Sequence, residues 1–115
     1  MNSEKLQLWI LDTLAEDYYS FCELKDYILA SGVSFRELEN SLNYLFETGF
    51  IAVKYLLPGE TFAARKYGSI TNEDQKKAID AFEDIARREK SSVSCHYLET
   101  TEAGLSYYHS SGYQQ

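Results

Sequence analysis

The chain is poor in the residues from which metal centres, disulfides and many active sites are built. Its 115 residues include only two Cys, two His, one Met and one Pro. Cys22 and Cys95 stand far apart and have no metal-type spacing such as Cys-x-x-Cys, which favours free thiols in a reducing compartment. His96 and His109 each lack a second ligand at metal spacing, so we expect no metal site.

Catalytic motifs are also missing. On an extended strand, the side chains of Cys95 and His96 would point to opposite faces, so the two neighbours cannot form a catalytic dyad. The six glycines are scattered over helix ends and turns, and no phosphate-binding glycine loop is present. We therefore predict that the chain is not an enzyme, needs no cofactor and has no small-molecule substrate.

Long hydrophobic runs are absent as well. No apolar run approaches the roughly eighteen residues that a membrane-spanning helix needs. The segment Met1 to Leu14 lacks the basic start and the small-residue cleavage site of a signal peptide. We expect a cytoplasmic protein with no membrane partner.

The chain is rich in acidic and aromatic side chains. The formal net charge is −7 and the isoelectric point is about 4.7. This charge repels nucleic acid at long range and attracts basic partners. There are ten Tyr and six Phe, so we expect some Tyr rings at the surface, where they serve binding as readily as packing.

The length favours a single domain, because a chain of this size buries about two thirds of its unfolded surface without disulfides or metals. We place this domain at residues 1–109, with an insertion at about 56–92. The polar residues 110–115 are expected to form a flexible tail.

A helix followed by a strand, from Ser34 to Tyr55, organises the rest of the chain. Ser34 and Glu37 form a capping box at the helix start, and Gly49 supplies the left-handed residue that ends the helix. The apolar stripe of the helix and the strand after it comprise Leu38, Leu42, Leu45, Phe46, Phe50, Ile51 and Val53.

Two further helices are predicted before this one. Ser3 is the expected cap of the first helix, whose apolar residues repeat at helical spacing. The second helix begins with a capping box of Ser20 and Glu23 and ends near Gly32. Only a few residues separate it from the third helix, which is the spacing of a helix-turn-helix.

After the strand, a turn at Pro58-Gly59 predicts a return strand over Thr61 to Tyr67. A fourth helix is predicted over Thr71 to Arg88, with charged pairs at i, i+4 on its outer side. Val93 to Leu98 has the pattern of a further strand, and Thr101 is the expected cap of a last short helix.

This order of elements resembles the winged-helix domains of small bacterial regulators such as the PadR and MarR groups. The resemblance covers Leu6 to Tyr55 and Val93 to Tyr108, and it includes the motif Thr101-Glu102-Ala103-Gly104 at the end of the wing. The chain differs in having a whole helix inserted between the wing strands. We therefore expect an α+β fold, with a winged-helix-like three-helix core, a small antiparallel sheet and an inserted fourth helix. The predicted core is Leu6, Trp9, Ile10, Leu24, Ile28, Leu38, Leu42, Leu45, Phe46 and Ile51.

The resemblance implies that the third helix would read DNA, because Arg and Asn side chains opposite its apolar stripe can recognise guanine and adenine. However, residues 1–47 carry nine acidic residues against three basic ones, whereas phosphate contacts need cations. A DNA-binding regulator, with a homodimer as one form of it, is therefore the alternative hypothesis. Its candidate DNA-binding residues are Arg36, Asn40, Asn43, Lys76 and Lys77.

Our first hypothesis is a protein-binding surface. Tyr18 and Tyr19 follow acidic residues at the end of the first helix, and an acidic aromatic surface suits a basic protein partner. Packing of the two Tyr rings in the helix junction is an equally open interpretation. The candidate partner-binding residues are Asp12, Glu16, Asp17, Tyr18, Tyr19, Glu39 and Glu47. The function predicted from them is a small acidic cytoplasmic protein-binding module, such as an immunity protein or antitoxin that inhibits a basic nuclease toxin.

Overall fold

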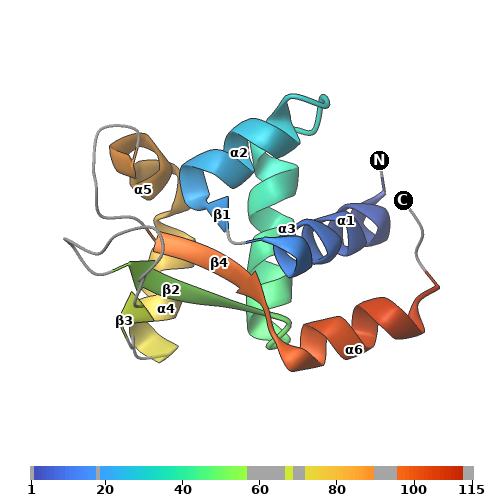
Figure 1. The fold of residues 1–115 in the computed structure, drawn as a ribbon. Helices are drawn as coiled ribbons and strands as arrows, with labels where there is room; N and C mark the ends of the chain where they lie inside the picture. Colours follow the sequence, from blue (N-terminus) through green and yellow to red (C-terminus); the bar gives the residue numbers. More distant parts are fainter. Residues whose placement is uncertain (1, 18, 57–66, 69–71, 90–95, 113–115) are drawn as a thin grey trace.

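The structure, a computed structural model, describes residues 2–17, 19–56, 67–68, 72–89 and 96–112. In chain order the elements are α1 (Ser3–Glu16), β1 (Tyr19–Ser20), α2 (Phe21–Leu29), α3 (Phe35–Glu47), β2 (Ile51–Leu56), β3 (Tyr67–Gly68), α4 (Asn72–Asp80), α5 (Phe82–Glu89), β4 (His96–Thr100) and α6 (Glu102–Ser110). Helix α3 packs against both α1 and α2, and a small sheet lies beside them (Figure 1). The fold is the expected α+β class, with a three-helix core.

In the described part of the chain, the sheet has four strands in the order β1-β4-β2-β3, and all pairings are antiparallel. In the longest pairing, between β2 and β4, Val53 lies opposite Leu98, and both side chains are buried. The two-residue strand β1 pairs with β4 and attaches the segment between α1 and α2 to the sheet. No sequence pattern predicts β1, because two residues are too few to show an alternation.

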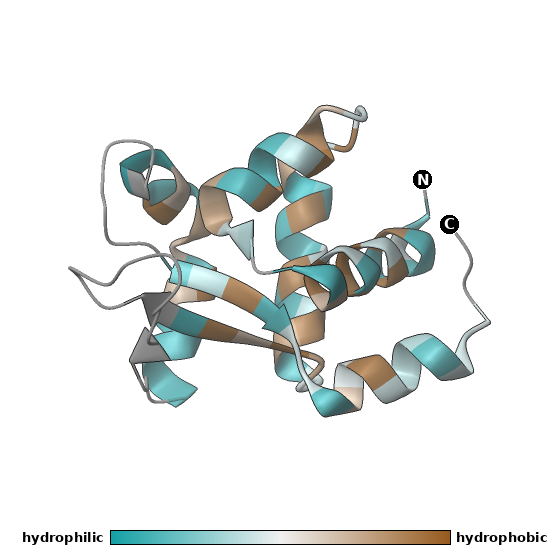
Figure 2. Cartoon of the chain, in the orientation of Figure 1, coloured by the Kyte–Doolittle hydropathy of each residue, from teal (hydrophilic) through white to brown (hydrophobic). Residues whose placement is uncertain are grey.

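The apolar sides of α1, α2 and α3 meet the sheet in one core, and hydrophobic and hydrophilic stretches alternate along these helices (Figure 2). Most of the predicted core is confirmed. Trp9 and Phe46 are the exceptions, because they are only partly buried and pack at the edge of the core. The predicted core residues that are buried are Leu6, Ile10, Leu24, Ile28, Leu38, Leu42, Leu45 and Ile51.

Two predicted capping boxes are confirmed. The hydroxyl oxygens of Ser20 and Ser34 each accept a hydrogen bond of 3.1 Å from the backbone N–H three residues later. The cap of α1 is Asn2 and not Ser3, because the Asn2 Oδ1 accepts the N–H of Lys5 at 2.8 Å. Asn and Ser are both good N-caps, so residue type alone does not decide which of the two adjacent positions caps the helix.

The predicted cap of α6 is also confirmed. The Thr101 hydroxyl oxygen accepts the N–H of Gly104 at 3.1 Å and donates to the carbonyl oxygen of Gly49 at 2.6 Å. The Thr101 N–H donates to the carbonyl oxygen of Phe50 at 3.0 Å. Gly104 is buried at this crossing, where a β carbon would overlap the Phe50 carbonyl oxygen. The Thr-x-x-Gly motif therefore holds α6 against the turn that follows α3.

The predicted fourth helix consists of two helices, α4 and α5, with an interruption at Ala81. Helix α4 packs on α3 and β2, whereas α5 packs on α2. Phe82 is fully buried, with its ring centroid 4.9 Å from that of Phe21 and 5.6 Å from that of Phe35. The insertion therefore completes the core of the three helices.

Other predicted boundaries differ from the structure. The last strand is described from His96 to Thr100, so it ends two residues later than predicted, and its predicted start at Val93 lies outside the described residues. Of the predicted return strand, only Tyr67 is described, in β3; residues 57–66, with the Pro58-Gly59 turn, lie outside the described residues. Helix α6 includes Ser110, so the helix extends into the predicted tail, of which residues 113–115 are not described.

Candidate protein-binding surface

Three aromatic side chains from α1, β1 and α2 form a cluster at the surface. The ring centroid of Tyr27 lies 5.5 Å from that of Trp9 and 5.8 Å from that of Tyr19. Tyr27 is 46% exposed, while Trp9 and Tyr19 are partly buried. Large rings that are held on one side and open on the other are typical anchors of protein interfaces.

Three carboxylates lie near Tyr19, one ring of this cluster. Burial raises the pKa of Tyr19 above its usual value, and the neighbouring Tyr27 raises it further. The negative charges of Asp17, Glu23 and Glu16 raise this pKa too, and all three acids are exposed. Acidic charge is therefore concentrated near Tyr19. We call Trp9, Glu16, Asp17, Tyr19, Glu23 and Tyr27 the acidic aromatic surface.

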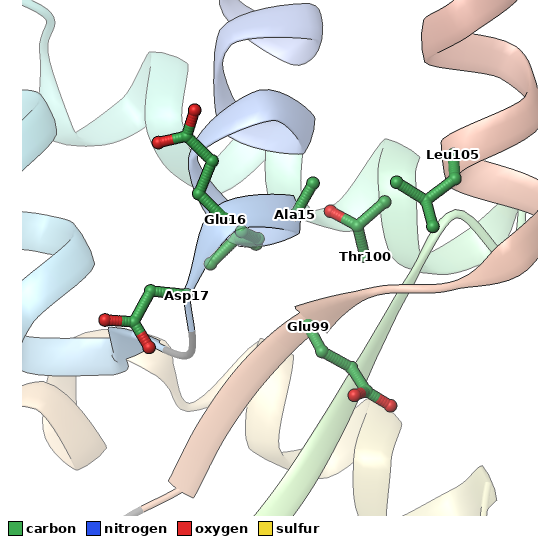
Figure 3. A pocket seen from close by; sticks show the side chains of 7 residues that line it. Ala15, Glu16, Asp17, Glu99, Thr100 and Leu105 are labelled. Carbon is green, nitrogen blue, oxygen red and sulfur yellow. The ribbon is translucent and has the colours of Figure 1, made fainter.

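A pocket of about 290 Å³ adjoins this surface at the end of α1. Thr100 and Leu105 line its interior, and the carboxylates of Glu16, Asp17 and Glu99 point outward in different directions (Figure 3). The acids therefore form a rim and do not converge on one point. Within the described ranges, no group of three or more His, Cys, Asp and Glu is placed to hold a metal ion. The Glu99 Oε1 lies 3.0 Å from the Nζ of Lys54, which offsets its charge, whereas Glu16 and Asp17 are the exposed acids of this rim.

Asp12 does not belong to this surface, contrary to the sequence-based prediction. It is only 6% exposed, and the Tyr108 hydroxyl donates a hydrogen bond of 2.7 Å to its Oδ1. Leu8, one turn earlier on the same side of α1, is also buried. The prediction was wrong because α1 is covered by α6 as well as by the core, so a position beside the apolar stripe is still buried.

The other predicted partner-binding residues fall into two groups. Glu16, Asp17 and Tyr19 belong to the acidic aromatic surface, whereas Glu39 and Glu47 are on α3. Glu47 is exposed and lines a different pocket, beside α4, while Glu39 is partly buried. Tyr18 lies outside the described residues.

Three members of the surface have no binding role in the sequence-based interpretation. Helical spacing assigns Trp9 to the core, and the capping box explains Glu23 without any partner. The sequence pattern that could have indicated a binding role is on α2, where Glu23 and Tyr27 are four residues apart and thus on one side of the helix. That Tyr19 contacts this side depends on β1, which the sequence does not reveal.

The candidate DNA-binding residues of α3 differ in exposure. Arg36 and Asn40 are exposed, whereas Asn43 is partly buried. Lys25 of α2 lies near the start of α3, with its Nζ 5.4 Å from the ring centroid of Phe35. One exposed Arg and two amides are a sparse set of donors for a duplex backbone.

The two predicted lysines of the insertion lie beside carboxylates. Lys76 lines the same pocket as Glu47 and Glu73. The Nζ of Lys77 lies 3.5 Å from the Glu73 Oε1, as the i, i+4 spacing predicts. Acidic neighbours therefore offset both positive charges, which weakens their attraction for phosphate.

His96 has contacts that explain it as a packing residue. Its ring stacks on Phe21, with centroids 6.1 Å apart and an angle of 24° between the planes. Burial lowers the pKa of His96, and the positive charge of Arg88 lowers it further. The neutral imidazole is therefore favoured where β4 meets α2.

No protein family, curated protein or solved structure matches this chain. Within the described part of the chain, no helix has both the length and the apolar content that crossing a membrane requires.

Proposed function

We propose that this chain is a small acidic module of the cytoplasm that binds and inhibits a basic protein partner. An immunity protein or antitoxin that neutralises a nuclease toxin is an example of this class of protein. A nuclease must present a cationic surface to bind phosphates, and an acidic inhibitor can occupy that surface.

The observation that carries this proposal is the grouping of Glu16, Asp17 and Glu23 around Tyr19, next to the exposed ring of Tyr27. In protein interfaces, a few residues carry most of the binding energy, and Trp and Tyr are enriched among them. Charges around such residues accelerate association and exclude wrong partners. The net charge of −7 extends the attraction for a basic partner beyond the interface itself.

Affinity capture from the native host tests the proposal. The chain is immobilised, cell extract freed of nucleic acid is passed over it, and bound proteins are released in steps of increasing salt and then identified. We expect a basic protein that elutes as the salt screens the interface. A partner of neutral or acidic charge, or one that only denaturant releases, would contradict the proposed mode of binding.

A winged-helix DNA-binding regulator is the second candidate, favoured by the exposure of Arg36 and Asn40 on α3. Titration of fluorescent genomic duplex fragments at physiological salt distinguishes the two. We expect no useful affinity for DNA, because Lys76 and Lys77 lie beside carboxylates and Arg36 is the remaining cation among the candidate DNA-binding residues. Sub-micromolar binding that weakens steeply with salt and is lost in Arg36→Ala would establish the regulator instead.

A further inference from the structure

The carboxylate of Glu23 is held in place by the capping box at the start of α2. Its Oε1 accepts the backbone N–H of Ser20 at 3.3 Å, and the Glu23 N–H donates to the Ser20 hydroxyl oxygen at 3.1 Å. Glu23 is exposed, and no other described residue donates to its carboxylate or forms an ion pair with it. The second oxygen, Oε2, is therefore available to a donor from outside.

The ring of Tyr27 lies one turn further along α2, on the same side of the helix as Glu23. The rings of Trp9 and Tyr19 pack against it at interplanar angles of 52° and 73°. Because Tyr27 is still 46% exposed, part of its ring is fixed by neighbours and part is open. A fixed ring beside a fixed carboxylate loses little conformational entropy when a partner binds.

This pair of groups attracts positive charge. The π face of a Tyr ring carries partial negative charge and attracts cations. Besides burial, the negative charges of Tyr27, Asp17, Glu23 and Glu16 raise the pKa of the adjacent Tyr19. Glu16 is exposed and, like Glu23, takes part in no ion pair with a described residue. A cation over the open part of the Tyr27 ring is therefore stabilised by the ring and by these carboxylates together.

Among cationic side chains, Arg matches this arrangement better than Lys. Side chains four residues apart on a helix have their β carbons about 5 to 6 Å apart, a distance that a guanidinium group spans. The planar guanidinium can lie flat on a ring while the N–H groups at its edge donate to a carboxylate beside that ring. The Lys ammonium is compact and more strongly hydrated, so it gains less from the ring.

We propose that Glu23 and Tyr27 form a recognition site for an Arg side chain of the basic partner. The guanidinium stacks on the open part of the Tyr27 ring, and its N–H groups donate to the Oε2 of Glu23. This inference rests on the proposed function, since it names the partner's side chain that the acidic aromatic surface binds. Arg and not Lys is then the residue that the partner needs at this contact.

Three peptides test the choice of side chain. They are N-acetylated and C-amidated Gly-Ser-Arg-Ser-Gly and its analogues with Lys or citrulline in the central position. Each is titrated to about 20 mM into the ¹⁵N-labelled chain at low salt, because a contact of one side chain is weak. NMR follows the Tyr27 amide and the Tyr27 ring protons, which are assigned by their loss in Tyr27→Leu. We expect saturable shifts with the Arg peptide, about threefold weaker binding of the Lys peptide, and no saturable shift with the uncharged citrulline peptide.

Two substitutions test the two halves of the site, each with a matched control. Glu23→Gln removes the charge and keeps the cap, because Gln also serves in capping boxes, and should weaken binding of the Arg peptide about threefold. Its control, Glu37→Gln, makes the same change in the capping box of α3, where the residue one turn later is the buried Ser41 and not a ring. Tyr27→Leu removes the π face and should also weaken binding about threefold. Its control is Tyr44→Leu, at a ring that is 44% exposed on α3. Both controls should leave the affinity unchanged.

The inference is overturned if the Tyr27 signals do not respond to the Arg peptide or if the Lys peptide binds equally tightly. It is also overturned if either control substitution weakens binding as much as the substitution it is matched to. None of these results depends on affinity capture, which tests the proposed function separately. Failure to capture a basic protein contradicts the proposed function whatever the peptides show, so the two failures are distinguishable.

Discussion

The Tyr108 hydroxyl satisfies a buried carboxylate, that of Asp12, and thereby connects α6 to α1. At the scale of single residues, this contact shows that Asp12 has a structural role, unlike acids whose side chains are exposed to a partner. Glu16 and Asp17 are exposed one turn further along the chain, so their charge acts outward. Charge in the sequence thus indicates function only after burial is known.

Tyr108→Phe removes the donor and should lower the free energy of unfolding by about 1 to 3 kcal/mol, because the buried Asp12 loses a hydrogen bond. Tyr107→Phe is the matched control: the ring of Tyr107 stacks on Phe50 at 4.7 Å, and that contact does not need its hydroxyl. Its effect should stay within about 0.5 kcal/mol. Urea unfolding followed by circular dichroism measures both, and equal losses in the two variants would refute the role assigned to this bond.

His96 should make stability depend on pH. Its pKa in the folded chain is lowered by burial and by Arg88, so below pH 6.5 the unfolded chain binds more protons than the folded chain. The contribution of His96 to the free energy of unfolding is therefore fully present above pH 6.5 and is lost as the pH falls toward the pKa of His96 in the folded chain. We expect the NMR titration midpoint of His96 to lie lower in the folded chain than in urea. A folded midpoint equal to or above the unfolded one would contradict this.

At the scale of secondary-structure elements, side-chain motifs predicted the helix starts well because capping is local. Ser20, Ser34 and Thr101 all accept the expected backbone hydrogen bonds. Strand β1 and the interruption at Ala81 could not be predicted, because both depend on contacts with elements distant in sequence. In physical terms, a two-residue strand is stabilised by its partner and has no intrinsic signal.

The Thr-x-x-Gly motif gives a prediction for α6. In Gly104→Ala the new β carbon would overlap the Phe50 carbonyl oxygen and lie 2.8 Å from the Thr100 Cγ2. We expect a loss of about 1 to 3 kcal/mol in the free energy of unfolding, because backbone must move to relieve the overlap. Ser106→Ala, exposed on the same helix, should not destabilise the chain, because Ala is the better helix former. Thermal unfolding of both variants decides, and an unaffected Gly104→Ala would contradict the close approach of α6 and the turn after α3.

At the scale of the whole molecule, the composition indicated the chemistry of the partner but not the location of the contact. The net charge of −7 favours a basic partner wherever it binds. Only the folded arrangement shows which acids surround exposed rings, since Tyr19 and Tyr27 come from different elements. The same arrangement assigns Asp12 to the interior and Glu47 to a separate groove. A single helix projection cannot make these distinctions.

The role of the insertion also becomes clear only at the scale of the whole molecule. Its sequence indicates a helix with a solvated, charged outer side and an apolar side that includes Ala78, Phe82 and Ile85. In the folded chain, Ile79, Phe82 and Ile85 are buried against the three-helix core. The ion pairs that Glu73 and Glu83 make with Lys77 and Arg87 remain on its outer side, as the i, i+4 spacing predicts. The segment therefore has a packing role that its periodicity only partly reveals.

The central claim is that the acidic aromatic surface binds a basic protein, and parallel affinity capture tests it most directly. Three columns carry the wild-type chain, the double variant Glu16→Lys/Asp17→Lys, and the control Asp80→Lys/Glu83→Lys, which has the same change in net charge on α4 and α5. We predict that a basic protein is retained on the wild-type and control columns and is reduced by roughly tenfold on the Glu16→Lys/Asp17→Lys column. Equal retention on all three columns, or retention of no basic protein on the wild-type column, would contradict the account.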